Sequence, residues 1–274
     1  MTDRYAVIGN PIAHSKSPLI HAAFARATGA DLTYVALLAP LGGFLEVVRS
    51  FFAAGGCGAN VTVPFKQQAV ALADEIGSRA RAARAANVLT VREGRVVADN
   101  TDGVGLMRDL EGNLGCAVQG RRVLLMGAGG AAWGVAGPLL EKGPALFSVV
   151  NRTRDKAVAL AQHFASAAEA CTPEALAYEE LVGRRYDLVV NATSAGLADA
   201  MPVLPPDLFA PEALAYDMVY GKTTPFLQFA HRHGAQTADG TGMLVEQAAE
   251  SFYIWRGVRP ETAPVIALLK SGES

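Results

Sequence analysis

A glycine turn between an apolar run and a helical pattern is the feature that most constrains the fold. The apolar run Val123–Met126 leads into Gly127 and Gly129, and Ala132 completes a G-x-G-x-x-A pattern before a helical stretch that extends to Glu141. In such a unit the first glycine permits a tight turn and the second lets a ligand approach the backbone. The small third residue allows the helix to pack closely on the strand. The segment therefore predicts the first turn of a dinucleotide-binding domain.

The start of this helix supplies the groups that would bind the ligand. Backbone N–H groups at a helix N-terminus attract a pyrophosphate. A second apolar run, Leu146–Val150, follows at the spacing that a βαβ unit requires. A glycine-rich turn without a ligand is the alternative interpretation. The residues expected to contact the cofactor at this turn are Gly127, Ala128, Gly129, Gly130 and Ala131.

The residues after the second apolar run indicate which dinucleotide binds. NAD sites usually carry Asp or Glu about 20 residues beyond the glycine turn, where the carboxylate holds the ribose 2′-hydroxyl. Here the run ends in Asn151, Arg152, Thr153 and Arg154, with Lys156 two residues further on. Guanidinium groups match the geometry of a phosphate. These residues predict NADP(H), bound through its 2′-phosphate; a solvated basic turn is the alternative.

The chain alternates strand and helix patterns twice, with an interruption at Asp99–Gly103. A length of 274 residues allows two domains, and strands that alternate with helices predict α/β domains with largely parallel sheets. We predict an N-terminal open α/β substrate domain over residues 1–103 and a Rossmann-type dinucleotide-binding domain over residues 104–239. The helical patterns of residues 240–274 are expected to pack back on the first domain.

Two helix starts in the first domain bear on the site. Ser17 and Pro18 have the form of an N-cap followed by a first helical residue, and this helix is expected to run to about Ala27. Pro64 precedes another helix, which places Lys66 near its start. A lysine is electrostatically unfavourable at the positive end of a helix. The position of Lys66 therefore indicates a functional role.

Composition excludes several classes of function. The chain has 24 Lys and Arg against 26 Asp and Glu, and this balance argues against a nucleic-acid-binding protein. No apolar run reaches the roughly 18 residues of a membrane helix. Three widely spaced cysteines fit unlinked thiols, and the five histidines lack metal-ligand spacing. We predict a cytoplasmic protein with a small-molecule substrate and no metal, nucleic-acid or membrane partner.

Polar residues follow several predicted strands of the first domain. They occur in the segments His14–Ser17, Asn60–Lys66 and Asp99–Asp102, and at Asn87. In open α/β sheets, ligands bind beyond the carboxyl ends of the strands. The substrate is therefore expected at this edge of the first domain.

Over most of its length the sequence resembles the shikimate/quinate dehydrogenase family, and in particular its NADP-dependent shikimate dehydrogenases. The matching motifs lie in family order and extend from residue 5 to about residue 265. They are Gly9–Pro18, Gly58–Lys66, Asp99–Gly105, Gly127–Ala131, Asn151–Thr153, Asn191–Ser194 and Asp239–Gln247. The resemblance implies reduction of 3-dehydroshikimate to shikimate with NADPH, in the chorismate route to the aromatic amino acids.

By this resemblance Lys66 and Asp102 are the catalytic residues. Reduction of a ketone needs a proton at the developing alkoxide, and the reverse reaction needs a base for the hydroxyl. An ammonium can donate the proton and stabilise the charge, while a neighbouring carboxylate holds the lysine. Their titration is shared, so the general base is not assigned to either one. A purely structural ion pair is the alternative.

The resemblance also implies a set of ligand contacts. Ser15 and Ser17 match the pair that binds the substrate carboxylate, although Ser17 can also serve as a plain helix cap. Asn87 as a helix cap and Thr62 as an ordinary strand residue are further alternatives. The other implied substrate contacts are Thr62, Asn87, Asp102, Tyr220 and Gln247. The implied cofactor contacts outside the glycine turn and the basic segment are Thr193, Met218 and Gly240.

Two other functions remain open from the sequence. A quinate or dual quinate/shikimate dehydrogenase would use the same fold, and a non-catalytic NADP-binding sensor would not need Lys66 and Asp102. The sequence is compatible with a monomer or a homodimer.

Overall fold

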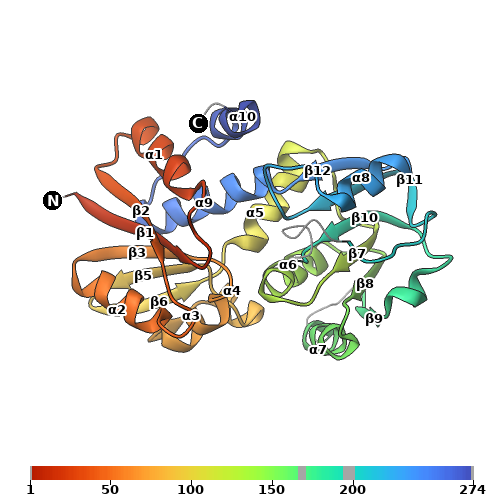
Figure 1. The fold of residues 1–274 in the computed structure, drawn as a ribbon, viewed down its shortest axis with the longest axis horizontal. Helices are drawn as coiled ribbons and strands as arrows, with labels where there is room; N and C mark the ends of the chain where they lie inside the picture. Colours follow the sequence, from red (N-terminus) through yellow and green to blue (C-terminus); the bar gives the residue numbers. More distant parts are fainter. Residues whose placement is uncertain (1, 166–170, 194–200, 273–274) are drawn as a thin grey trace. The chain divides into compact units, whose positions relative to one another are not determined.

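The computed structural model describes residues 2–165, 171–193 and 201–272. The chain forms two units (Figure 1): unit 1 comprises Met1–Gly105 with Val245–Ser274, and unit 2 comprises Leu106–Leu244. The sequence predicts the corresponding boundaries at 103/104 and 239/240. Both units have the predicted α/β architecture, and the C-terminal residues belong to the same unit as the N-terminal ones.

Unit 1 is built on a six-stranded mixed sheet with the strand order β2-β1-β3-β5-β6-β4. Its strands are β1 (Asp3–Gly9), β2 (Leu32–Leu38), β3 (Gly56–Val61), β4 (Glu75–Ile76), β5 (Val88–Arg92) and β6 (Arg95–Asp99). β1 is parallel to β2 and β3, whereas β5 is antiparallel to both of its neighbours, β3 and β6. The N-terminal end of β5 therefore lies at the edge of the sheet where β1, β3 and β6 end.

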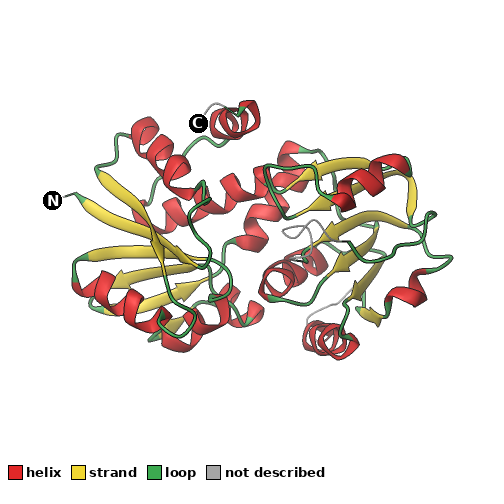
Figure 2. Ribbon diagram, in the orientation of Figure 1, coloured by secondary structure: helices red, strands yellow, loops and turns green. Residues whose placement is uncertain are grey.

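Helices cover both faces of this sheet (Figure 2). The helices of unit 1 are α1 (Ser17–Thr28), α2 (Phe44–Ala53), α3 (Lys66–Leu72), α4 (Ser78–Ala83) and α10 (Ala263–Ser271). Two helices, α5 (Asp102–Arg108) and α9 (Thr241–Arg256), cross the boundary to unit 2. Phe44, Val48 and Ala69 bury apolar surface of α2 and α3 in one core cluster. On α1 and α9, Phe24 and Phe252 meet edge to face.

The predicted cap of α1 is wrong by one residue. Ser17 is the first residue of the helix and not its N-cap, which is Lys16, and no side chain caps the helix. The Ser17 amide instead donates to the Ser15 hydroxyl at 3.3 Å. A residue from the preceding turn thus takes over the acceptor role that a capping side chain usually has.

Unit 2 has a parallel six-stranded sheet with the strand order β12-β11-β10-β7-β8-β9. Numbered from the first strand of the unit, this is 6-5-4-1-2-3, the order typical of a Rossmann domain. The strands are β7 (Arg122–Met126), β8 (Leu146–Val150), β9 (Glu174–Leu176), β10 (Tyr186–Asn191), β11 (Phe209–Asp217) and β12 (Gln236–Asp239). The strand order reverses between β7 and β10, where such domains bind their ligands.

Unit 2 buries its sheet between two layers. The helical elements are η1 (Asp109–Asn113), α6 (Gly130–Glu141), α7 (Arg154–Ala165), η2 (Tyr178–Leu181) and α8 (Pro225–Arg232). Val123 and Leu125 of β7 pack in one core cluster with α6 and α7, and Leu124 and Met126 pack in another with α8. This alternation buries both faces, as expected for a parallel sheet. Among the described residues, no helix is long and apolar enough to span a membrane.

Candidate active site

Lys66 and Asp102 form an ion pair at the carboxyl edge of the unit 1 sheet. Lys66 begins α3 after β3, and Asp102 begins α5 after β6. Because β3 and β6 point the same way on either side of β5, both helix starts lie at one edge. Lys66 Nζ lies 2.5 Å from Asp102 Oδ2, with 16% of the lysine and 5% of the aspartate side chain exposed. The arrangement holds an ammonium at a fixed position with limited access to water.

Asn87 orients the other oxygen of the Asp102 carboxylate. Its Nδ2 donates to Asp102 Oδ1 at 2.9 Å and also lies 3.2 Å from Gln247 Oε1 on α9. Its Oδ1 accepts the Thr101 amide at 2.8 Å, which sets the direction of the side-chain amide. Asn87 immediately precedes β5, so the reversed strand brings it to the edge where Lys66 and Asp102 lie. Four predicted residues are thus joined in one network.

The structure adds residues to this network that the sequence analysis did not assign to the site. Thr101 is fully buried and accepts from Asn87 Nδ2 at 3.0 Å. Asn60 Nδ2 donates to the Asn87 carbonyl at 3.1 Å and to the Ser251 hydroxyl at 2.9 Å. Tyr34 donates its hydroxyl to Asn60 Oδ1 at 2.7 Å. The position of Asn60 within the Gly58–Lys66 motif was the available signal, whereas Tyr34 and Ser251 become neighbours only through folding.

The predicted carboxylate-binding serines lie on the turn that follows β1. Ser17 is buried and Ser15 is half-buried, and the hydrogen bond between them ties the turn to the start of α1. Burial raises the pKa of Tyr34 well above its ordinary value, and a hydrogen bond from Ser17 opposes this shift. Ser17 therefore lies near Tyr34, whose hydroxyl donates to Asn60 in the same polar network.

Thr62 lies where β3 turns toward Lys66. Its amide donates to the Ile8 carbonyl and its carbonyl accepts from the Phe65 amide, each at 3.0 Å. These bonds hold the turn across Pro64 and place Thr62 between the end of β1 and the start of α3. Thr62 is thus at the same sheet edge as the other predicted substrate contacts of unit 1.

In unit 2, the glycine turn has the geometry that the sequence predicts. Gly127 follows β7 with φ +107°, and a Cβ at this position would lie 3.1 Å from the Ala192 carbonyl. A side chain here would be strained by the backbone conformation and crowded by the Ala192 carbonyl. Gly129 is the N-cap of α6 in an extended conformation, with no side-chain cap on the helix. A Cβ on Gly129 would have no neighbour within 4 Å, so the space beside this residue is open, between Ala128 and the start of α6 at Gly130 and Ala131.

The carboxyl ends of β10, β11 and β12 bring three predicted cofactor contacts together. Thr193 donates its hydroxyl and its amide to Asn191 Oδ1, at 2.7 and 3.1 Å. The Met218 amide donates to the Asn191 carbonyl at 3.0 Å. Gly240 packs so closely on Met218 that a Cβ would overlap the Met218 carbonyl. Ser194, the last residue of the motif that begins at Asn191, lies outside the described residues.

A buried aspartate that the sequence analysis did not identify holds these loops. Asp217, at the end of β11, accepts from Thr224 Oγ1 at 2.6 Å, the Val219 amide at 3.0 Å and Asn191 Nδ2 at 3.1 Å. Burial raises its pKa, although these hydrogen bonds act in the opposite direction. Asp217 therefore positions the segments that carry Thr193 and Met218.

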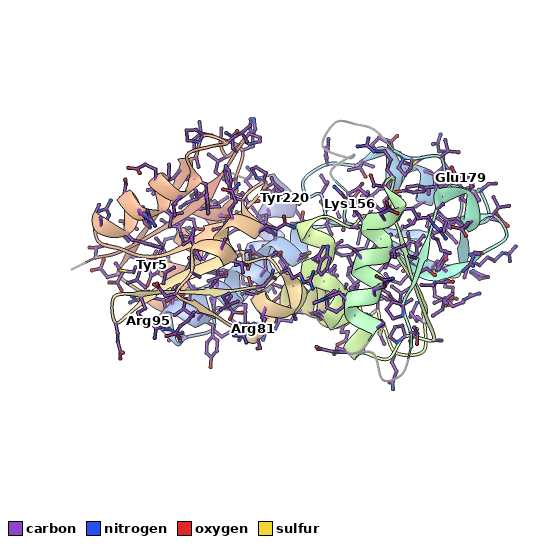
Figure 3. All side chains as sticks on the ribbon, turned by 90° about the horizontal axis from the view of Figure 1, so that it is seen from below. Tyr5, Arg81, Arg95, Lys156, Glu179 and Tyr220 are labelled. Atoms are coloured by element: carbon purple, nitrogen blue, oxygen red, sulfur yellow. The ribbon has the colours of Figure 1, made fainter. Side chains whose placement is uncertain are left out.

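The basic segment after β8 is exposed, as a phosphate site requires. Asn151 Nδ2 donates to the Thr153 carbonyl at 2.9 Å and shapes the turn before α7. Arg152 and Lys156, the latter on the first turn of α7 (Figure 3), are both exposed. Arg154 is also exposed, but its Nη2 lies 3.5 Å from Glu180 Oε2.

Glu180 was absent from the sequence prediction. It also accepts from the Ala177 amide at 2.7 Å, which ties it to the start of η2. The three cations are therefore not equivalent, since Arg154 already faces a carboxylate.

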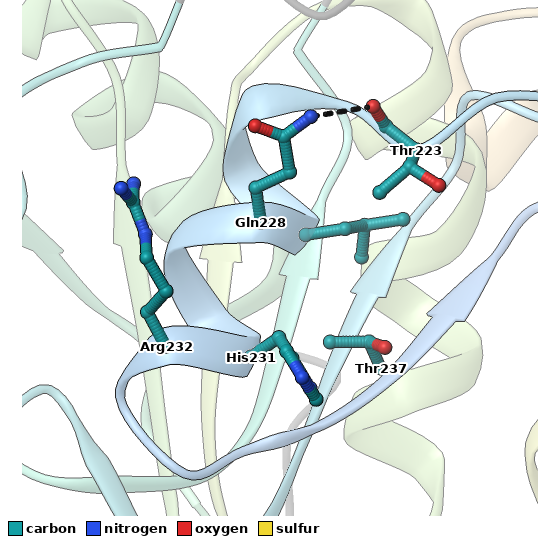
Figure 4. Close-up of a pocket in the computed structure, with 6 residues that line it drawn as sticks. Thr223, Gln228, His231, Arg232 and Thr237 are labelled. Carbon is teal, nitrogen blue, oxygen red and sulfur yellow. Dashed lines mark hydrogen bonds between the residues drawn. The ribbon is translucent and has the colours of Figure 1, made fainter.

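Two remaining features of unit 2 lie outside these groups. Tyr220 is half-buried on the loop after β11 (Figure 3), on a different unit from the other predicted substrate contacts. A shallow pocket forms between α8 and β12 (Figure 4). It is lined by Thr223, Leu227, Gln228, His231, Arg232 and Thr237. None of these lining residues is among the predicted site residues.

Comparison with known proteins gives a consistent result along the chain. A family model described as the shikimate dehydrogenase substrate binding domain matches residues 7–89. A shikimate/quinate 5-dehydrogenase model matches residues 111–198, and a model of the shikimate 5′-dehydrogenase C-terminal domain matches residues 240–270. The matches follow the order in which the two units use the chain.

Individual relatives are similar over nearly the full length. The chain is 58% identical over 273 residues to the shikimate dehydrogenase (NADP(+)) of Nitrosospira multiformis, covering 99% of this chain and 98% of that protein. An Ael1 enzyme from Pseudomonas putida is 50% identical, with a TM-score of 0.90 and 98% of both chains covered. Shikimate 5-dehydrogenase from Thermus thermophilus, solved with NADP(H) and shikimate, is 34% identical, with a TM-score of 0.87 and coverage of 98% and 99%.

Proposed function

Because the chain belongs to the shikimate dehydrogenase family, we propose that it catalyses the NADPH-dependent, reversible reduction of 3-dehydroshikimate to shikimate. The reaction is a step in the biosynthesis of the aromatic amino acids. The observation that carries the proposal is the Lys66–Asp102 pair at 2.5 Å, held by Asn87 at the edge of the unit 1 sheet. A sensor that only binds a dinucleotide has no need of a partly buried lysine oriented by a network of this kind.

The roles of the pair follow from the charge that develops during the reaction. NADPH, when bound, supplies the hydride that reduces the ketone carbon. The ketone oxygen gains negative charge, and the Lys66 ammonium donates a proton to it and forms the hydroxyl. In the oxidation of shikimate the same pair accepts that proton. Asp102 holds Lys66 in place and accepts a hydrogen bond from the substrate alcohol.

The substrate is held, in this proposal, by groups at the edge of the unit 1 sheet. Ser15 and Ser17 donate hydroxyls to the substrate carboxylate at the start of α1, without a buried counter-charge. Thr62, Asn87 and Gln247 contact the ring hydroxyls, because their side chains offer both donors and acceptors. Tyr220 contributes a further contact from unit 2.

The cofactor residues fit NADP(H). The uncapped start of α6 and the open space at Gly129 suit a pyrophosphate at Gly127–Ala131. Arg152 and Lys156 are exposed cations for the 2′-phosphate, and the remaining proposed contacts continue the binding surface of unit 2. These are Asn151, Thr153, Arg154, Thr193, Met218 and Gly240. Unit 1 is thus the proposed substrate domain and unit 2 the proposed NADP-binding domain.

The two glycines of the turn should respond differently to alanine. Gly129→Ala should leave the free energy of unfolding unchanged, because its backbone is extended and a Cβ meets nothing. It should weaken NADPH binding about tenfold or more, because the methyl group occupies space that the pyrophosphate needs. Gly127→Ala should instead lower the free energy of unfolding by about 1–3 kcal/mol. Urea unfolding and titration with NADPH check both; normal NADPH affinity in Gly129→Ala would place the pyrophosphate elsewhere.

The proposed activity can be tested directly by following the nicotinamide absorbance. The purified protein should oxidise NADPH with 3-dehydroshikimate and reduce NADP⁺ with shikimate. It should be much slower with NADH at equal concentration, because Arg152 and Lys156 have no 2′-phosphate to bind. Equal turnover with NADH would overturn the cofactor assignment, and faster turnover of quinate with NAD⁺ would overturn the substrate assignment.

We also propose that the enzyme acts in the cytoplasm as a monomer or a homodimer. Cys57, Cys116 and Cys171 are free thiols in the structure, which agrees with a reducing compartment. Light scattering of the purified protein measures the oligomeric state.

A further inference from the structure

One arginine of unit 1 joins two carboxylates that lie 151 positions apart in the sequence. Arg79, the second residue of α4, binds Asp99 in a bidentate manner, with Nε–Oδ1 at 3.0 Å and Nη2–Oδ2 at 2.5 Å. Its remaining Nη1 donates to Glu250 Oε1 on α9 at 2.8 Å. All three guanidinium nitrogens, Nε, Nη1 and Nη2, therefore donate to carboxylate oxygens, a geometry that lysine cannot reproduce.

Asp99 connects this arginine to the catalytic carboxylate. Asp99 ends β6, three residues before Asp102, and its Oδ1 also accepts the Asn100 amide at 2.7 Å. Asn100 in turn accepts the Asp102 amide on its Oδ1 at 3.0 Å and donates to the Ala85 carbonyl at 2.8 Å. The side chains of Asp99 and Asn100 therefore hold the backbone from Asp99 to Asp102, and Arg79 fixes the side chain of Asp99.

Glu250 connects the same arginine to the helix that carries Gln247. Glu250 lies three residues after Gln247 on α9, nearly one helical turn, and only 9% of its side chain is exposed. Arg259 also binds it, with Nη2–Oε2 at 2.5 Å. Burial alone would raise the pKa of Glu250, but the bonds from Arg79 and Arg259 leave the pKa below its ordinary value. Glu250 is therefore a charged anchor on the inner side of α9.

We propose that Arg79 is a positioning residue for the reaction, which sets the Lys66–Asp102 pair and the Gln247 helix relative to each other. The inference rests on the proposed function and assigns a role that the resemblance does not include. The polar partners of Arg79 are Asp99 and Glu250, and it acts on Lys66 and Asp102 through them. Without it, Asp99 loses its bidentate partner and Glu250 keeps only Arg259, so the Asp99–Asp102 segment loses its anchor and its link to α9. Displacements of about 1 Å at a catalytic group can lower a rate about a hundredfold.

The test compares Arg79→Met with a control on the same sheet. Arg95, at the start of β6 (Figure 3), lies 2.5 Å from Glu75, but both side chains are about half exposed, at 57% and 49%. Arg95→Met therefore also removes an arginine–glutamate pair from unit 1, at the opposite end of β6 from Asp102. Arg79→Met should lower kcat at least tenfold at a temperature where circular dichroism shows it folded. Arg95→Met should keep kcat within twofold of the unchanged protein.

Crystal structures of the unchanged protein and of Arg79→Met give a second readout that does not require turnover. The distance from Lys66 Nζ to Asp102 Oδ2 should lengthen from 2.5 Å to beyond hydrogen-bonding range. If Arg79→Met does not fold, Arg79→Lys carries both tests, because it keeps the charge and loses the bidentate bond. An unchanged pair, a kcat within twofold, or an equal loss in Arg95→Met would overturn the inference. Inactivity of the unchanged protein would overturn the proposed function instead, and the crystal structures would still decide on Arg79.

Discussion

Alanine in place of Lys66 should lower kcat by about 10²- to 10⁴-fold, the range that loss of a positioned proton donor gives. Removal of the side chain leaves the developing alkoxide without a proton and without a nearby positive charge. The KM for shikimate should change little, because the proposed carboxylate and hydroxyl contacts lie on other segments. Steady-state rates in both directions, with NADPH and NADP⁺, check the prediction.

A second lysine–carboxylate pair serves as the control for this variant. Lys142 Nζ lies 2.6 Å from Glu111 Oε2 on the surface of unit 2, where both side chains are more than a third exposed. Exposed pairs contribute little to stability, so Lys142→Ala should keep both kcat and the melting temperature. A kcat near that of the unchanged enzyme in Lys66→Ala would show that the Lys66–Asp102 pair is structural only.

The second large effect concerns the stability of unit 1 below neutral pH. His21 on α1 is 1% exposed, and neither ring nitrogen has a hydrogen-bond partner. Its ring stacks on that of Tyr34, with the ring centroids 4.1 Å apart, and lies beside the ring of Trp255, with the centroids 5.4 Å apart. Burial lowers the pKa of His21 from 6.5 to about 3, and Asn60 acts in the opposite direction. The folded protein therefore keeps this imidazole neutral at a pH where the unfolded chain protonates it.

The direction of the pH dependence follows from these two pKa values. Above pH 6.5 this histidine is neutral in both the folded and the unfolded protein, so its titration does not lower the free energy of unfolding. Between pH 6.5 and about 3 only the unfolded chain binds the proton, so the free energy of unfolding falls as the pH falls. The loss from this residue should reach about 2 kcal/mol at pH 5. Stability that stays level from pH 7 to pH 5 would contradict the shifted pKa.

Fluorescence of Trp255 can isolate this effect, because it lies beside His21. In a Trp133→Phe background, urea unfolding at several pH values should show the decline, and His21→Phe should remove most of it. His231→Gln, at an exposed position of α8, should retain the decline and is the control. The same decline in His21→Phe would assign the effect to other groups.

The parts of the fold that the sequence predicts are those with local signals. The glycine turn at Gly127 and the apolar runs Val123–Met126 and Leu146–Val150 before and after it each depend on neighbouring residues, and the structure contains all of them as β7, the turn and β8. The elements that the sequence analysis left out are short or lack a clear period. They are β4, β9, η2 and β12. The three strands among them form by pairing with β6, β8 and β11, which lie elsewhere in the sequence.

The residues of the candidate site also fall into two groups, those with a local sequence signal and those without one. Lys66, Asn87 and Asp102 stand in motifs that follow strands, so resemblance and chemistry both point to them. Arg79 and Glu180 stand in no such motif. Arg79 meets Asp99 and Glu250 only when α4 packs on β6 and α9, and Glu180 meets Arg154 only when η2 lies beside α7. The incorrect cap at Ser17 has a related cause, because the Ser15 hydroxyl that replaces it comes from a turn whose shape is tertiary.

The reversed direction of β5 has a consequence for how the chain can change in length. The hairpin of β5 and β6 places Asn87 and Asp102 at one edge of the sheet and the turn at Glu93 and Gly94 at the opposite edge. Five residues of strand separate the two, about 16 Å. Extra residues in that exposed turn would lengthen a loop at modest entropic cost and leave the register of both strands intact. The turn is therefore a suitable point to insert a tag or a label without disturbing the residues that hold the substrate.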